Sequence, residues 1–152
     1  MLRDLSYPAT LEIDEDGRVV VGFRDLVGAQ TDGTDRAEAL DEAQDCLREA
    51  VAATLRHKEP LPEPSPPQAG EVMVPLPLAM AAKVVLIHAA REAGLGPRGL
   101  AAELGCDPKE AQRLLDPDHG TRIERLTEAI RALRGPWLKV SLCRPDVVSE
   151  QS

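Results

Sequence analysis

The chain has 152 residues, a formal net charge of −8 and 43% hydrophobic residues, but only one Trp, one Tyr and one Phe. This length allows one domain or two small ones, with cores built from aliphatic side chains. There is no run of 18 apolar residues and no signal peptide at the amino terminus, so we expect a cytoplasmic protein that is neither exported nor membrane-spanning.

Charge is unevenly distributed along the chain. Residues 1–77 contain 7 basic and 16 acidic residues, a net of −9, whereas residues 78–152 contain 11 basic and 10 acidic residues, a net of +1. An acidic front half disfavours nucleic acid there and favours a basic protein partner. The back half could contact DNA, although it lacks a strongly basic balance.

The front half begins with a strand-type pattern. Tyr7 to Ile13 alternates, which places Ala9, Leu11 and Ile13 on one face of a predicted strand. Residues 14–17 (Asp-Glu-Asp-Gly) predict a turn. Arg18 to Phe23 predicts a second strand, and the two strands are expected to form a hairpin. Residues 28–31 predict a short third strand before another turn at residues 32–33.

A helix is predicted next, with Thr34 or Asp35 as its cap and its end near His57. Its apolar positions step by three and four, and an acidic face lies opposite them. This face and the edge of the sheet are candidate contacts for a basic protein partner. The acidic residues of the face are Glu38, Asp41, Glu42, Asp45 and Glu49. Residues 59–68 contain five prolines and predict an extended loop, after which residues 72–76 return to the sheet. Residues 1–76 therefore form the predicted front domain.

The back half is predicted to be helical, with a domain over residues 77–143. Its helices are expected at residues 78–93, 97–104, 108–115 and 123–133. Residues 137–142 alternate and predict a final short strand, and residues 144–152 predict a flexible tail. The fold class is therefore α+β, with a sheet and one helix in front of an all-α domain.

Residues 97–115 have the pattern of a helix-turn-helix. Gly105 suits the corner, Asp107 can cap the second helix, and Glu110 is placed to complete a capping box. The outward residues at the start of the second helix would be Pro108, Lys109, Gln112 and Arg113. Lysine and arginine suit guanine and glutamine suits adenine, while Arg98 and Arg122 could hold phosphates. The alternative is an ordinary helical bundle in which Lys109 and Arg113 are only solvated.

No motif in the sequence indicates catalysis. The acidic turn at residues 14–16 could hold a metal ion, but such turns are usually only solvated. Cys46, Cys106 and Cys143 are far apart and favour reduced thiols rather than a metal site. The chain lacks a P-loop and a dinucleotide fingerprint, so we expect no enzyme, no cofactor and no metal.

The ordered set of residues across both halves resembles the HicB antitoxin family. The resemblance rests on Tyr7-Pro8-Ala9, the acidic turn, Val19 to Phe23, the helix with Glu38-Ala39-Leu40 and the proline loop. The back half resembles the subclass that ends in a repressor-type helix-turn-helix. Departures include Arg24, Val27 and Ala29, where the family often has proline, proline and cysteine. Gly96 and Pro97 replace the usual hydroxyl residue and glutamine, so one phosphate contact is absent.

The resemblance implies a front domain with a partial ribonuclease-H-like fold that has no nuclease activity. It also implies a small, basic, HicA-like toxin as partner, which cleaves mRNA and whose catalytic histidine the antitoxin covers. The back domain would form a homodimer or homotetramer and repress its own operon by binding operator DNA. A different hypothesis is a stand-alone transcriptional regulator whose front domain senses a ligand, and a weaker one is a residual nuclease with carboxylates converging on a metal.

Overall fold

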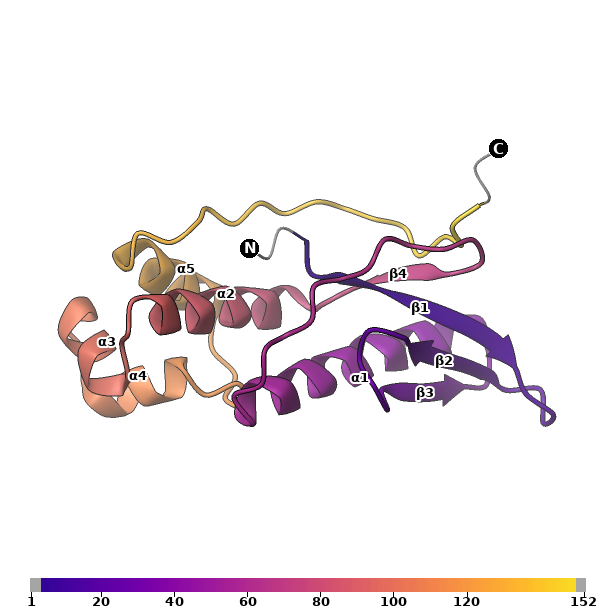
Figure 1. Ribbon diagram of the computed structural model, residues 1–152, viewed down its shortest axis with the longest axis horizontal. Coiled ribbons are helices and arrows are strands. Elements are labelled where there is room, and N and C mark those ends of the chain that lie inside the picture. The colour runs from indigo at the N-terminus through magenta and orange to yellow at the C-terminus, as the bar shows by residue number, and fades with distance from the viewer. Residues whose placement is uncertain (1–3, 150–152) are drawn as a thin grey trace. The chain divides into compact units, whose positions relative to one another are not determined.

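The computed structural model describes residues 4–149, which fall into two compact units (Figure 1). Unit 1 consists of the described residues up to Pro77 and from Leu142 onward, and unit 2 consists of Leu78 to Ser141. The last three residues of the predicted tail lie outside the described residues. No helix within residues 4–149 is long and apolar enough to cross a membrane.

Unit 1 contains a four-stranded antiparallel sheet in the order β3-β2-β1-β4. The strands are β1 (Ser6–Ile13), β2 (Val19–Phe23), β3 (Gln30–Gly33) and β4 (Val72–Pro75). Ala9 lies opposite Phe23 of β2 and opposite Val72 of β4. This arrangement confirms the predicted hairpin and the return of the fourth strand to the same sheet.

The connections between the first strands are fixed by glycine and aspartate. Gly17 has a φ of 77°, and Asp14 Oδ1 accepts hydrogen bonds from the amides of Asp16 and Arg18. The third strand was predicted two residues too early, and the turn predicted at residues 32–33 is wrong because both residues belong to β3. The turn lies earlier because Gly28, at a φ of 82°, completes it there.

One helix, α1 (Arg36–Arg56), covers the sheet of unit 1 (Figure 1). Asp35 is its N-cap and accepts from the Glu38 amide at 2.9 Å, whereas the Glu38 carboxylate accepts from Thr34. The buried stripe consists of Ala39, Ala43, Leu47, Val51, Ala52 and Leu55. Gly33 is required where β3 meets the helix, since a Cβ there would lie 2.4 Å from the Ala39 amide nitrogen. Ile13, expected on the apolar face, is instead 77% exposed at the end of β1.

The proline loop between α1 and β4 has no regular secondary structure, as predicted, but polar contacts hold it in place. Asp25 accepts from the Ser65 amide at 2.8 Å and from its hydroxyl at 2.6 Å. Glu71, only 3% exposed, accepts from Arg24 through both carboxylate oxygens and from the Gln68 amide. Hydrogen bonds of polar side chains therefore hold this loop, which has no ladder of backbone hydrogen bonds.

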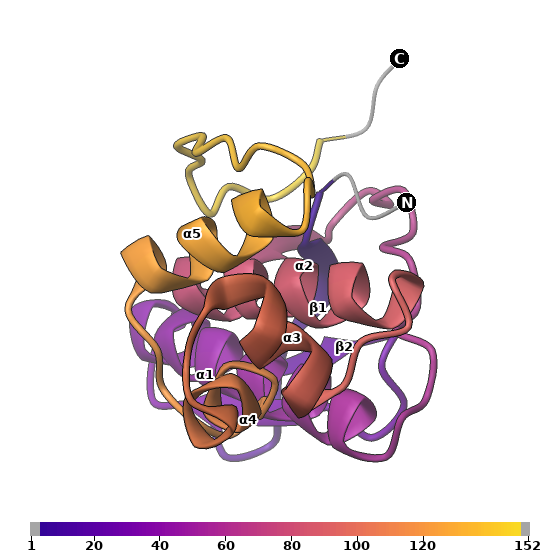
Figure 2. The ribbon, with the colours of Figure 1, turned by 90° about the vertical axis from the view of Figure 1, so that its left-hand side faces the viewer.

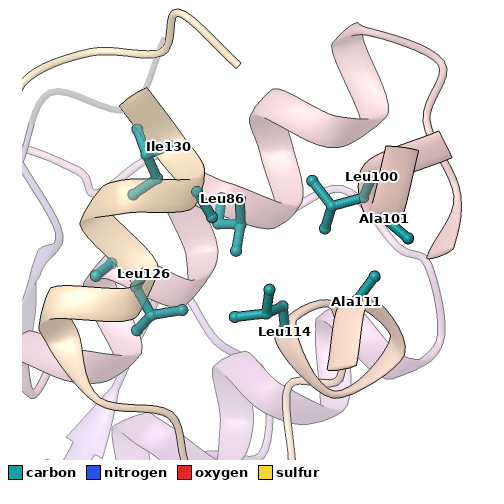
Figure 3. Packing of buried hydrophobic residues seen from close by; sticks show 9 residues of the cluster. Leu86, Leu100, Ala101, Ala111, Leu114, Leu126 and Ile130 are labelled. Carbon is teal, nitrogen blue, oxygen red and sulfur yellow. The ribbon is translucent and has the colours of Figure 1, made fainter. Parts of the chain in front are cut away.

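Unit 2 contains α2 (Leu78–Glu92), α3 (Pro97–Leu104), α4 (Pro108–Leu114) and α5 (Ile123–Ala132). Each helix contributes to one apolar core (Figure 3). The fully buried members of this core are Ala82, Leu86, Leu100, Ala101, Ala111, Leu114, Leu126, Ala129 and Ile130. Because the four helices share one core, the orientation of α3 and α4 is fixed by packing on both α2 and α5.

The predicted final strand at residues 137–142 is wrong for the described chain, where this stretch carries no strand. The chain leaves α5 at Arg134, which adopts the left-handed conformation at a φ of 55°. The Gly135 amide then donates a hydrogen bond to the Ile130 carbonyl. Further along, in the predicted tail, Val147 forms an isolated bridge with Val72 of β4, and the Val148 amide donates to the Glu71 carbonyl.

Tyr7 gives a pH-dependent signature for unit 1. Its hydroxyl donates to the Pro62 carbonyl at 2.6 Å, and burial, with help from Asp25 and Glu63, raises its pKa from 10.0 to about 12. A raised pKa means that the folded state holds the proton more tightly, so this stabilisation is complete below pH 10 and is lost as the pH rises through about 12.

The chain has a single tyrosine, so near-ultraviolet absorbance of tyrosinate reports Tyr7 alone. We expect a midpoint near pH 12 in the folded chain and near 10 in the same chain unfolded in urea. A folded-state midpoint near 10 would show that the hydroxyl is not buried against the proline loop.

Candidate nucleic-acid and protein interfaces

Helices α3 and α4 of unit 2 form the predicted helix pair. Gly105 adopts the left-handed conformation at a φ of 64°, and the Cys106 amide donates to the Ala101 carbonyl. Asp107 caps α4 by accepting from the Lys109 amide at 2.6 Å, and Pro108 occupies the first helical turn. The corner residue and the cap were therefore correctly predicted from the sequence.

The predicted base-reading residues share one exposed face of α4. Lys109, Gln112 and Arg113 are spaced by three and four residues and are all exposed, as is Pro108. The opposite face, with Ala111 and Leu114, is buried in the core of unit 2. In Figure 2, α3 and α4 lie toward the viewer. The helix therefore presents two cations and an amide from a rigid support.

The two predicted phosphate contacts are also accessible. Arg98 is exposed in the first turn of α3, and Arg122 is exposed as the N-cap residue of α5. Both residues lie next to a helix start, where backbone amides point outward and favour anions.

The predicted capping role of Glu110 is wrong. Its carboxylate pairs with Arg125 of α5, whose Nε lies 2.8 Å and whose Nη2 lies 2.7 Å from Oε1. Arg125 also contacts Glu128, and these two carboxylates raise the pKa of the guanidinium. An acidic side chain of α4 is thus neutralised on the side that faces α5.

Lys83 of α2 is a buried cation that the sequence reasoning missed. It is 3% exposed. Its ammonium nitrogen donates to four oxygens, which lie between the last turn of α4 and the start of α5. These are the carbonyls of Arg113 at 3.0 Å, Asp116 at 3.1 Å and His119 at 2.8 Å, and the hydroxyl of Thr121 at 2.9 Å. One ammonium therefore holds the end of α4 and the whole connection toward α5.

Burial lowers the pKa of Lys83 from 10.5 to about 8, against the opposing effect of nearby Asp116. The only hint of this residue in the sequence is its position, since it interrupts the apolar run from Met80 to Ile87 on a buried helix. A lysine in such a run requires several oxygen acceptors, and the connection after α4 supplies them.

The acidic face of α1 is the candidate protein interface in unit 1. All five predicted side chains are exposed, and their spacing places them within about 100° of the helix circumference. Glu38 is engaged by Thr34, which lowers its pKa, and Glu49 pairs with Arg48 at 2.9 Å. Within residues 4–149, Asp41, Glu42 and Asp45 have no ion-pair or hydrogen-bond partner, so they remain available to a cationic surface.

An open hollow of about 650 Å³ lies beside this face and was not predicted. Its floor is the second half of α1, including Cys46 and Ala50, and its walls are residues 25–30 and the start of the proline loop. Val27 at its rim is fully exposed. Residues far apart in the sequence line the hollow, so a linear pattern gives no sign of it.

No metal centre is found in the part of the chain that the structure describes. There, no three His, Cys, Asp or Glu side chains converge in a way that could hold a metal ion. In the acidic turn, Asp14 instead binds the amides of its own loop.

Comparison with known proteins identifies the family. Residues 6–85 match the family described as HicB_like antitoxin of bacterial toxin-antitoxin system. The chain belongs to the HicB-like antitoxins. It is 36% identical over 133 residues to Antitoxin HicB 2 of Photorhabdus laumondii, covering 88% of this chain and 94% of that protein. It is 33% identical over 129 residues to Antitoxin HicB of Escherichia coli K12, covering 85% and 94% respectively.

A more distant relative is Antitoxin HicB of Pseudomonas fluorescens, at 27% identity over 135 residues, with 88% of this chain and 92% of that protein covered. These matches extend well past residue 85, so the similarity to HicB antitoxins includes much of unit 2.

Replacing Lys83 tests its role in this HicB-like antitoxin. Lys83→Met keeps the aliphatic length but removes the ammonium donor from three partly buried backbone carbonyls. We expect unit 2 to lose about 2–3 kcal/mol of stability, measured as faster hydrogen exchange of the amides in α4 and α5. The exposed Lys109→Met change on α4 is the control and should cost less than about 0.5 kcal/mol. Equal protection in the two variants would contradict the structural role of Lys83.

Proposed function

We propose that this antitoxin binds and neutralises a small, basic, mRNA-cleaving toxin of the HicA type through unit 1. We further propose that it represses its own operon in the bacterial cytoplasm by binding operator DNA through unit 2. We propose no catalytic activity for it. The observation that carries the proposal is the exposed row of Lys109, Gln112 and Arg113 on a helix whose other face is locked into the core.

Operator reading is supported by the chemistry and placement of α4. Arginine and lysine can donate to the guanine edge and glutamine can pair with adenine in the major groove, which admits a helix. In a helix-turn-helix the second helix enters that groove and its first residues contact the bases. Pro108, Lys109 and Gln112 occupy these positions, while Arg98 and Arg122 hold the backbone. A two-fold operator would require two copies of the chain.

Toxin capture is supported by the charge of unit 1. Its three unengaged carboxylates, Asp41, Glu42 and Asp45, lie on one face of α1 together with Glu38 and Glu49. A ribonuclease that grips RNA must present cations, and an acidic face is complementary to such a surface. Binding there would also place antitoxin atoms where the toxin binds its substrate.

The hollow of about 650 Å³ in unit 1 favours a second candidate function. Its volume is that of a small-molecule site, so the chain could be a stand-alone transcriptional regulator that senses a ligand. A neighbouring gene that encodes a small basic protein, and its co-purification with this chain, would decide for the antitoxin function.

The first prediction of this proposal concerns DNA. Changing both Lys109→Ala and Arg113→Ala should weaken operator binding roughly 100-fold, measured by fluorescence anisotropy at low salt, because base and phosphate contacts are lost together. Toxin binding should be unchanged. The control removes two exposed cations from the end of α5, through Arg131→Ala and Arg134→Gly, and should retain most of the affinity. Undiminished DNA affinity in the Lys109 and Arg113 variant would remove the assignment.

The second prediction concerns the toxin. Neutralising Asp41→Asn, Glu42→Gln and Asp45→Asn should weaken toxin binding by about tenfold, mainly through slower association, and should flatten its salt dependence. A matched control neutralises three exposed acids near the first hairpin turn, through Glu12→Gln, Glu15→Gln and Asp16→Asn. Both variants have the same net charge. If surface plasmon resonance gives the same loss for both, the toxin does not dock on the acidic face of α1.

A further inference from the structure

The sheet of unit 1 ends in two edge strands, β3 and β4, and one of them already holds a piece of this chain. The described tail, residues 144–149, belongs to unit 1 and lies beside β4 (Figure 1). Val147 of the tail forms a bridge with Val72, and the Val148 amide donates to the Glu71 carbonyl at 2.7 Å. Within the described chain, no segment pairs with the free edge of β3. The outer edge of β4 therefore accepts an extended segment as its neighbour.

The pairing of β4 with β1 decides which backbone groups of β4 face outward. The Leu76 amide donates to the Leu5 carbonyl, which fixes the alternation of the antiparallel ladder between the two strands. Val72 and Val74 therefore bond to β1, and Met73 directs its amide and its carbonyl away from β1. Within the described chain, these two groups of Met73 make no hydrogen bond. The tail thus occupies the start of the edge and leaves its middle open.

Few contacts hold the tail on this edge. The Gly70 amide donates to the Val148 carbonyl at 3.0 Å. Arg36 at the start of α1 donates to the Pro145 carbonyl. Val147 is still 50% exposed where it meets the sheet. A segment that buries so little surface and makes so few bonds opens at low cost, so a competing strand can replace it.

A hollow of about 190 Å³ lies beside the same edge, between β4 and the first half of α1. Leu40 and Gln44 line it together with side chains of β4, and Pro145 of the tail lines it as well. Asp41 is its only charged lining residue, and this exposed carboxylate has no partner in the described chain. The edge therefore combines free backbone groups, an apolar hollow and one available carboxylate. These features suit an extended segment that carries a cation.

We propose that an extended strand of the basic toxin adds to the sheet of unit 1 at the outer edge of β4, in place of the tail. This inference rests on the proposed toxin binding and specifies how that binding occurs. Backbone hydrogen bonds to Met73 supply affinity, and a cation of the added strand lies against Asp41. The tail is then an intramolecular competitor, which occupies the edge until the toxin displaces it.

Charge favours the toxin over a second copy of this chain as the occupant. Residues 1–77 have a net charge of −9, so two copies that paired their β4 edges would bring two acidic domains together. Such a pair would also place both Asp41 carboxylates beside the same ribbon. A basic strand meets the opposite sign of charge at this edge and is attracted to it.

A proline in β4 tests the added strand. Met73→Pro removes the outward amide and leaves the ladder to β1 intact, so it should weaken toxin binding roughly tenfold. The control, Met73→Ala, keeps the amide and should stay within about twofold of the unmodified chain. Both are measured by isothermal titration calorimetry, with the full chain and the small basic protein encoded beside it. A Tyr7 titration midpoint that stays near 12 shows that unit 1 of the proline variant is folded. Equal affinities of the two variants would overturn the proposal.

A proline in the tail should have the opposite effect. Val148→Pro removes the amide that donates to Glu71, so it should free the edge and tighten toxin binding roughly three- to tenfold. The control, Ser149→Pro, places the proline one residue later, where the amide makes no hydrogen bond within residues 4–149. It should leave the affinity unchanged. The same affinity in both tail variants would contradict the competition between tail and toxin.

Hydrogen exchange of the Met73 amide gives a measurement on the unmodified chain. The toxin should slow this exchange by about tenfold or more, because the amide gains an acceptor. Toxin that binds without slowing it would refute the added strand and leave toxin capture standing. A chain that binds no toxin would refute the proposed function itself. Slower exchange on raising the concentration of the chain alone would assign the edge to a second copy and overturn the proposal.

Discussion

The candidate reading helix of this HicB-like antitoxin depends on one buried ammonium. Lys83 extends from the apolar α2 and donates to oxygens of four residues between Arg113 and Thr121. Helix α4 has seven residues and could not hold its own position by backbone hydrogen bonds alone. Packing fixes its inner face, and Lys83 fixes its end. The exposed row on α4 is therefore presented by a helix that is held at several points.

In unit 1 a buried carboxylate holds an irregular segment, as the buried ammonium does in unit 2. Glu71 is buried at the start of β4 and accepts from Arg24 and from the Gln68 amide, so it closes the proline loop onto the sheet. The hydrogen bond from Arg24 and burial act in opposite directions on its pKa, and the net result is a lowered pKa. Each unit thus combines an aliphatic core, which orients regular elements, with one buried charge that fixes an irregular segment. This matters because irregular segments have no backbone ladder of their own.

Much of the regular structure could be predicted because it follows from local rules. Alternation predicted β1, and three consecutive β-branched valines predicted β2. The steps of three and four predicted α1, and Gly105 with Asp107 predicted the corner between α3 and α4. The exposure of Lys109, Gln112 and Arg113 follows from the same helical periodicity. Local rules were sufficient where a residue's neighbours in space are also its neighbours in sequence.

The features that were missed depend on long-range contacts. Glu110 satisfies the sequence rule for a capping box, yet Arg125, fifteen residues later, takes its carboxylate. The acceptors of Lys83 lie thirty or more residues away, so its position in an apolar run could not reveal what it binds. The strand predicted at residues 137–142 needs a partner strand that the described chain does not supply. A sequence pattern shows which residues can form a helix or a strand. It does not show which distant residues supply the hydrogen-bond and ion-pair partners of that element.

The side-chain NMR signals of Lys83, followed against pH, show whether its buried ammonium holds the connection after α4. We expect slowly exchanging ammonium protons with couplings to the surrounding carbonyls, and a titration midpoint near 8 rather than the ordinary 10.5. A midpoint near 10.5 with rapid proton exchange would mean that Lys83 is solvated and does not hold this connection.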